Sequence, residues 1–132
     1  MKRAVKFVPV IAAALLIAVI KISGAQSPVI PTRTEVSSSA NPVSASQTLT
    51  ITARVNPVAP SPNAPSGALQ FYDANVLLGA ATLAQVNGVA TAVLSNVHLD
   101  PGSHPLIAKY AGDEHFGASD SVPPLPQRVT AP

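Results

Sequence analysis

The chain has no cysteine among its 132 residues, and this absence excludes several structures at once. No disulfide can form, so a folded domain lacks the roughly 2–4 kcal/mol that such a bond often contributes. A thiolate metal site and an acylated N-terminal cysteine are excluded as well. Tryptophan is also absent, and charged residues make up only 11% of the chain.

Aromatic residues are few: two tyrosines and three phenylalanines, of which Phe7 lies in an apolar N-terminal run. So few rings form no stacking platform for a sugar, and we expect Phe71, Tyr110 and Phe116 in a core. Tyr72 remains as the exposed ring and as the one candidate binding residue. No residue pattern indicates a cofactor.

The N-terminus has the layout of a secretory signal peptide. Residues 1–6 are basic, residues 7–20 are apolar and uncharged, and small residues at 23 and 25 precede a cleavage site after Ala25. The alternative is a retained membrane anchor, which needs roughly 18 or more consecutive apolar residues. This run is shorter and ends at Lys21, so the sequence predicts cleavage and export to the periplasm, the cell surface or the medium.

Cleavage changes the charge of the chain. The whole chain has a formal net charge of +2 and a pI of about 9.3. Removing residues 1–25 removes four of the eight basic residues and none of the six acidic ones, which leaves a net charge of −2. A basic surface is the usual mark of a nucleic-acid partner, so none is expected. Membrane contact is expected only through an uncleaved signal segment.

The part after residue 25 suits one domain. Most of the 14 prolines lie there, which disfavours long helices and favours short strands joined by turns. We expect a short leader at 26–31, a domain at 32–129 and a tail at 130–132.

Alternating apolar and polar residues predict the strands. The clearest are 48–55 and 106–110, each with one apolar face. After the second, Gly112 and Asp113 reverse the chain so that Phe116 folds back onto that face.

Weaker signals complete the pattern. Residues 67–73 alternate and end in a turn, and Asn87-Gly88 predicts a hairpin. The inward face of 89–94 stays open, because two sets of residues compete for it. Residues 121–132 are proline-rich and predict at best an irregular edge strand. About seven short strands at this spacing indicate an all-β sandwich.

Five segments of the chain also match, in order, the recurrent segments of a known domain family. They are Thr32-x-Thr34 with Asn41-Pro42, Gln47-x-x-Thr50-x-x-Ala53-x-Val55, Gly67-x-x-x-Phe71-Tyr72-Asp73, Leu77-Leu78-Gly79 with Asn87-Gly88-Val89-Ala90, and Gly102-x-His104-x-Leu106-x-Ala108-x-Tyr110-x-Gly112-Asp113-x-x-Phe116. In series they resemble the bacterial Ig-like domain of repeat-containing exported and surface proteins. The resemblance implies an Ig-like β-sandwich that binds or scaffolds proteins, without catalysis.

Two positions depart from the pattern of that family. Ala92 stands where phenylalanine is common, which implies an underfilled core. Pro105 lacks a backbone donor in a strand that should be central, which predicts a bulge or a local edge.

Residues that could carry chemistry do not assemble into a recognised motif. The spacings of His98, His104 and His115 do not match a zinc site, so no metal site is expected. No nucleophile elbow or glycine-rich oxyanion segment accompanies the serines, so no enzyme is expected. His104 is expected inside its strand or at its boundary.

The acidic residues in turns leave calcium binding open. Asp100, Asp113, Glu114 and Asp120 could offer oxygen ligands, but no calcium-loop motif is present. We expect Asp113 to cap its own turn.

The expected partner is a protein of the envelope or the extracellular space. The alternative is a carbohydrate-binding module for envelope or extracellular polysaccharide, with Tyr72 as the contact. Residues 57–60 fit the P-x-x-P pattern, although a rigid loop explains the prolines as well. The weak tail at 121–132 also suggests exchange of an edge strand with a partner.

Overall fold

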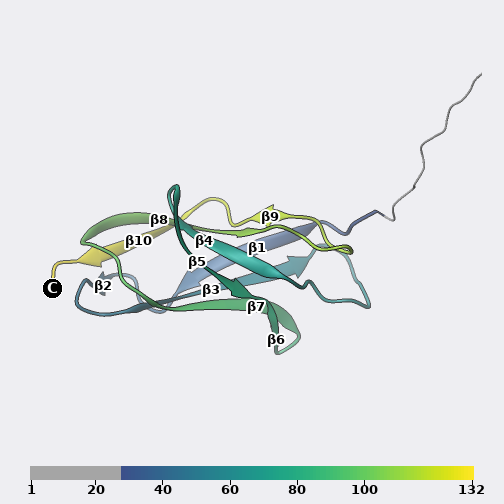
Figure 1. Ribbon diagram of the computed structural model, residues 1–132, viewed down its shortest axis with the longest axis horizontal. Coiled ribbons are helices and arrows are strands. Elements are labelled where there is room, and N and C mark those ends of the chain that lie inside the picture. The colour runs from purple at the N-terminus through teal and green to yellow at the C-terminus, as the bar shows by residue number, and fades with distance from the viewer. Residues whose placement is uncertain (1–27) are drawn as a thin grey trace, which may run out of the picture.

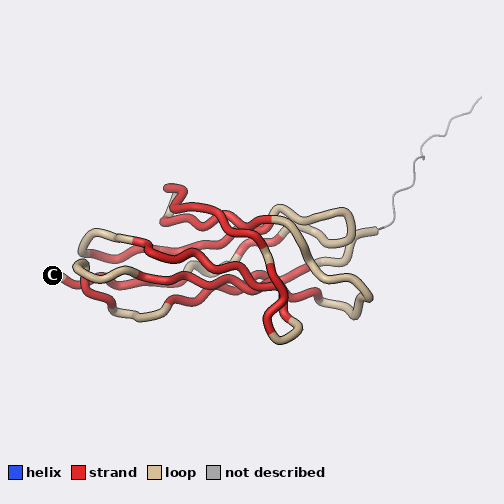
Figure 2. The backbone as a smooth tube through the Cα atoms, turned by 60° about the horizontal axis from the view of Figure 1, so that its bottom comes forward, coloured by secondary structure: helices blue, strands red, loops and turns tan. Residues whose placement is uncertain are grey.

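The computed structural model describes residues 28–132, so the predicted signal peptide and its cleavage site after Ala25 lie outside the described residues. Within this range no helix is present, and the strands run along one long axis in two layers (Figures 1 and 2). The strands are β1 (Thr32–Ser38), β2 (Val43–Ser44), β3 (Leu49–Pro57), β4 (Ala68–Asp73), β5 (Val76–Thr82), β6 (Ala84–Val86), β7 (Val89–Val97), β8 (Gly102–Tyr110), β9 (Ser119–Asp120) and β10 (Leu125–Thr130).

The strands form two sheets. The four-stranded sheet has the order β1-β3-β7-β6, and the six-stranded sheet has the order β2-β10-β8-β4-β5, with β9 paired to β8. Seven strands have six or more residues, whereas β2 and β9 have two residues each and β6 has three. This confirms the predicted all-β sandwich of about seven strands.

The core lies between the two sheets, and the apolar side chains of the predicted alternating strands fill it. Leu49, Ile51, Ala53 and Val55 of β3 are buried, as are Leu106, Ala108 and Tyr110 of β8. Phe71 and Phe116 are buried too, which confirms the predicted aromatic core. Ala92 lies opposite Ala53 in the register of β3 with β7. At this pair the four-stranded sheet supplies only small side chains, while the buried aromatic rings of the described residues come from β4, β8 and the corner after β8.

The structure shows which face of β7 points inward, a question that the sequence left open. Ala90 and Ala92 point into the core, and Val93 is exposed. The predicted hairpin before β7 is also confirmed, since β6 pairs with β7 across Asn87 and Gly88. These two residues have φ angles of 51° and 81°, the left-handed conformation that a type I′ turn requires.

The predicted irregular tail is wrong. Residues of the segment 121–132 form β10, which pairs with β8 along one side and with the short β2 along the other. Gln127 and Val129 of β10 are buried. The prolines are tolerated because Pro126 lies opposite Pro105 of β8, and facing residues at alternate positions exchange no hydrogen bond.

This pairing also explains Pro105. Its carbonyl accepts a hydrogen bond from the Ala74 N–H on the β4 side (2.9 Å), and the Pro126 carbonyl accepts one from Asn41 Nδ2 on the other side (3.0 Å). The pairing of β4 with β8 ends at Asp73, which faces Leu106. Pro105 therefore lies just beyond this pairing, at a local edge, which is one of the two predicted outcomes. The β8–β10 register is continuous through it.

The end of the leader is attached to the sandwich. Ile30 forms a bridge with Phe116, and its N–H donates to the His115 carbonyl at 2.9 Å. The Gly117 N–H donates back to the Ile30 carbonyl, also at 2.9 Å. The chain is therefore fixed to the corner after β8 before β1 begins.

Candidate functional site

The outward face of the six-stranded sheet carries a row of apolar side chains. Tyr72 of β4 lies opposite Leu77 of β5 on one side and opposite Ile107 of β8 on the other. Facing residues of antiparallel strands share a face, and the adjacent Phe71 and Ala108 are in the core, so the row points outward. Leu77 is 52% exposed, and the other two are half-buried. We call Leu77, Tyr72 and Ile107 the Tyr72 row.

Tyr72 is more covered than the sequence predicted. Its hydroxyl donates to Gln70 Oε1 at 3.1 Å, and Lys109 Nζ lies 5.0 Å from the centre of its ring. Gln70 and Lys109 face each other across β4 and β8. A cation at this distance is attracted to the ring face, worth about 0.5–1 kcal/mol at an exposed site. The ring is thus held in place at the centre of the row.

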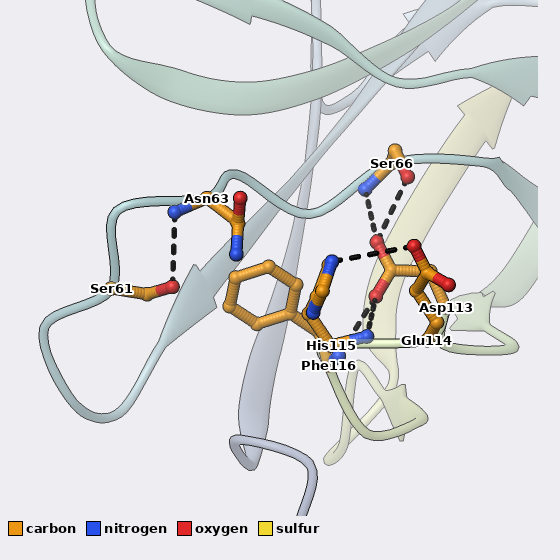
Figure 3. A network of polar contacts seen from close by, with 7 residues as sticks. All are labelled: Ser61, Asn63, Ser66, Asp113, Glu114, His115 and Phe116. Atoms are coloured by element: carbon orange, nitrogen blue, oxygen red, sulfur yellow. Dashed lines mark hydrogen bonds and ion pairs between the residues drawn. The ribbon is translucent and has the colours of Figure 1, made fainter. Parts of the chain in front are cut away.

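Asp113 caps the corner after β8, as the sequence predicted (Figure 3). Its Oδ1 accepts hydrogen bonds from the N–H groups of His115 (2.7 Å) and Phe116 (2.8 Å). Its Oδ2 accepts from the N–H (3.0 Å) and the hydroxyl (2.8 Å) of Ser66, which lies in the loop before β4. Burial by itself raises the pKa of Asp113, but these donors outweigh it and lower the pKa below its ordinary value. The carboxylate therefore joins two distant segments.

The other turn acids do not gather around it. Among residues 28–132 no group of three or more His, Cys, Asp and Glu side chains could hold a metal ion. Asp120 lies on β9, while Asp100 lies in the turn before β8. Asp100, Asp113 and Asp120 therefore lie in different segments of the described residues and do not form one cluster.

His104 lies at the boundary of its strand, within the predicted range. Its Nδ1 is 2.6 Å from Asp73 Oδ2, and its Nε2 is 2.7 Å from the carbonyl oxygen of Asp100. An Asp–His pair of this kind orients the base in a hydrolase triad. Here, however, the second nitrogen faces a carbonyl instead of a serine hydroxyl. His98 and His115 are exposed and lie away from this pair in the chain.

Two of the hollows on the surface of the described residues lie next to the proline-rich segments. One, of about 400 Å³, lies between the proline-rich loop after β3 and the β6–β7 hairpin, and no charged side chain lines it. The other, of about 590 Å³, lies between β1 and the segment from β9 to β10, and its charged residues are Arg33, Glu35 and Asp120. Neither is lined by a histidine.

Leu77 and Ile107 are surface residues that sequence reasoning did not single out. Ile107 could have been found, because the alternation that turns Leu106 and Ala108 inward turns Ile107 outward. Leu77 could not, because the register of β4 with β5 shifts between Phe71 and Tyr72. This irregularity makes Leu78 the extra residue, and Leu78 packs partly against the core.

The two packed sheets, with the order β1-β3-β7-β6 facing β2-β10-β8-β4-β5, define an immunoglobulin-like β-sandwich. The family model for the bacterial Ig-like domain (group 3) matches residues 36–130, and the chain belongs to this family. Such domains are typically non-catalytic and common in exported or surface proteins. Comparison with curated proteins gave no match, and comparison with solved structures gave none. The described part of the chain has no helix that could cross a membrane.

Proposed function

We propose that the protein is an exported binding and scaffolding module that contacts another protein of the envelope or the extracellular space through the Tyr72 row. The observation that carries the proposal is the row itself, in which the exposed Leu77 and the half-buried Tyr72 and Ile107 form an apolar surface on a hydrogen-bonded sheet. Exposed apolar side chains rimmed by polar ones are typical of protein-binding surfaces. Gln70 and Lys109 form such a polar rim.

The rigidity of the row supports a binding role. Tyr72 is fixed by Gln70 and Lys109, so little side-chain freedom is lost when a partner covers it. Tyrosine is also among the residues enriched where binding energy concentrates in protein interfaces. A sheet surface of this kind needs no movement of loops before it binds.

The contact of Lys109 with the ring favours a protein partner over a polysaccharide. A sugar binds tyrosine by stacking on a ring face, and here Lys109 Nζ lies over one face at 5.0 Å. A sugar on that face would have to displace the ammonium group. An apolar or acidic side chain of a protein can pack beside Leu77 and Ile107 while the ring keeps this contact.

The polar groups that could suggest catalysis are used in structure. His104 Nε2 faces the Asp100 carbonyl, so it cannot accept a proton from a serine without leaving that contact. Asp113 is held by four hydrogen bonds from Ser66, His115 and Phe116. These arrangements support a binding module rather than an enzyme.

Export rests on the N-terminal segment. The basic start, the apolar run and the small residues before Ala25 support a signal peptide. The test is a mass measurement on protein recovered from its own cells, in which a chain beginning at Gln26 is expected. A chain that retains residues 1–25 would replace the secreted form by a membrane-anchored one.

The binding proposal is tested by crosslinking in intact cells with a C-terminally tagged chain. We expect a defined protein to be recovered, and Leu77→Ser and Ile107→Ser to weaken its binding about tenfold each, which is about 1.4 kcal/mol. Val93→Ser is the matched control, because Val93 is exposed on the other sheet. An equal loss with Val93→Ser, or recovery of polysaccharide alone, would contradict the proposal.

A further inference from the structure

The strand orders end in β1 and β6 on one sheet and in β2 and β5 on the other, and three of these four strands are unsuited to pairing with another chain. The β2 strand has two residues and β6 has three. The β1 strand is longer but carries Arg33 and Glu35 on its exposed positions. Short length and charge are two of the means by which proteins prevent pairing at a sheet edge, and β-bulges are another.

The fourth edge, β5, is neither short nor charged, and its one irregularity is the shifted register at Leu78. Its seven residues, Val76–Thr82, include no charge and no proline. In the described residues it pairs with β4 alone, so its second side carries no strand. Val76 is 64% exposed and Leu77 is 52% exposed. The turn that joins β4 to β5 projects from the body of the sandwich, which leaves this end of the edge accessible (Figure 1).

We propose that this edge pairs in antiparallel orientation with β5 of a second copy of the chain, so that the protein forms a two-fold symmetric dimer. A two-fold contact uses the same surface on both copies, so each residue of β5 faces a residue from the same set. Because that set is uncharged, no charge loses its water without a partner. A charged strand from another protein would lose its hydration against Val76 and Leu77.

Such a dimer would enlarge the proposed binding surface. Leu77 belongs both to β5 and to the Tyr72 row, so pairing of the two edges brings the two rows to a common junction. The two six-stranded sheets would become one continuous sheet across the two-fold axis. The proposal goes beyond the proposed function, because pairing of the edges needs no third partner.

The length of the edge limits its affinity. Seven residues span about 24 Å at about 3.4 Å per residue. A contact along one strand of this length lies at or below the roughly 1,200 Å² at which stable interfaces begin. The dimer is therefore expected to dissociate on dilution.

Sedimentation equilibrium of the protein as recovered from its cells, over a range of concentrations, tests the proposal. We expect a monomer–dimer equilibrium that Ala80→Lys weakens at least tenfold, because Ala80 is exposed on β5 and the two introduced ammonium groups would repel each other. Ala118→Lys, an exposed alanine in the corner before β9, is the matched control and should behave as the wild type. A wild type that stays monomeric, or a dimer that Ala80→Lys leaves unchanged, would overturn the proposal.

Absence of cysteine allows a second test of the same contact. In this background Ala80→Cys introduces the only thiol, and a short bismaleimide should link two copies through it. Ala118→Cys should give far less linked dimer under the same conditions. Equal linkage at both positions would show a contact that does not involve β5.

These experiments separate dimer formation from partner binding. Tyr72→Ala removes the centre of the Tyr72 row but leaves the edge of β5, so it should reduce capture of the partner and keep the dimer. Ala80→Lys should dissociate the dimer when no partner is present. Failure of the dimer test therefore leaves the proposed function standing, and failure of partner capture leaves the dimer standing.

Discussion

His104 Nδ1 lies 2.6 Å from Asp73 Oδ2, and this contact joins the start of β8 to the end of β4. The second ring nitrogen faces the Asp100 carbonyl at 2.7 Å. Burial by itself lowers the pKa of His104, but the Asp100 carbonyl and the Asp73 carboxylate outweigh it, and the pKa is raised above its ordinary value of 6.5. Both acceptors favour the protonated ring, which can donate to each of them.

The first prediction is a loss of stability as pH rises. Since the folded state has the higher pKa, the contribution of His104 is complete below the unfolded pKa of about 6.5 and is lost as pH rises through the folded value. The free energy of unfolding, measured with urea between about pH 5.5 and 8.5, should fall over this window. His104→Gln should remove this decline.

His115→Gln provides the control for this pH dependence. His115 is exposed, and its Nε2 lies 3.3 Å from Glu114 Oε1 at the surface. The decline with pH should therefore persist in this variant. An unchanged slope in His104→Gln would show that another group causes the dependence.

The second prediction concerns Asp113. Asp113→Ala removes the acceptor of four hydrogen bonds and should cost about 1–2 kcal/mol at neutral pH. Since the pKa of Asp113 is lowered in the folded state, its contribution is present above the unfolded pKa of about 3.9 and is lost as pH falls below it. Urea unfolding at neutral and acidic pH measures both effects.

Asp120→Ala is the control for the Asp113 variant, because Asp120 lies exposed on β9. It should change the stability by less than about 0.5 kcal/mol. Equal costs for the two variants would mean that the Asp113 cap contributes nothing specific.

The third prediction tests the core. Phe71 is 1% exposed, so Phe71→Ala should cost about 3–5 kcal/mol. This is a large part of the roughly 5–15 kcal/mol that stabilises a domain. Replacement of the exposed Val76 by alanine, the control, should cost less than about 0.5 kcal/mol. A loss below about 1 kcal/mol for Phe71→Ala would contradict the register of β4.

The fourth prediction concerns the C-terminal strand. Deletion of residues 121–132 removes β10, with its buried Gln127 and Val129, and exposes one side of β8. We expect the chain to fail to fold, seen as loss of dispersed amide signals in NMR spectra. Deletion of residues 131–132 alone, which follow β10, should leave the fold intact. A folded protein without residues 121–132 would show that β10 is dispensable.

Much of the fold could be predicted from local pattern. The strand at 48–55 was clear because Leu49, Ile51, Ala53 and Val55 alternate with polar residues, and Asn87-Gly88 fixed the hairpin because both residues adopt positive φ angles. The Asp113 cap is predictable because a carboxylate after glycine can accept hydrogen bonds from its own turn. In each case the cause lies within a few residues.

The rest depended on pairing between distant segments. The prolines of 121–132 predict an irregular edge when read alone, and they fit a strand only because Pro126 meets Pro105. The Tyr72 row depends on the shifted register that leaves Leu77 outward. Its surroundings also depend on Lys109 reaching Tyr72 from β8. No local pattern contains such long-range partners.

The attachment of Ile30 has a mechanical consequence. The two ends of the described chain lie at opposite ends of the long axis, and β1 and β10 run along that axis (Figure 1). Tension applied at the two ends would load the hydrogen bonds of β1 with β3 and of β10 with β8 in shear, so that many rungs bear the force together. On the N-terminal side the force would first reach the bonds of Ile30 to the corner at His115 and Gly117. The geometry suits a link that must transmit a pulling force without unravelling.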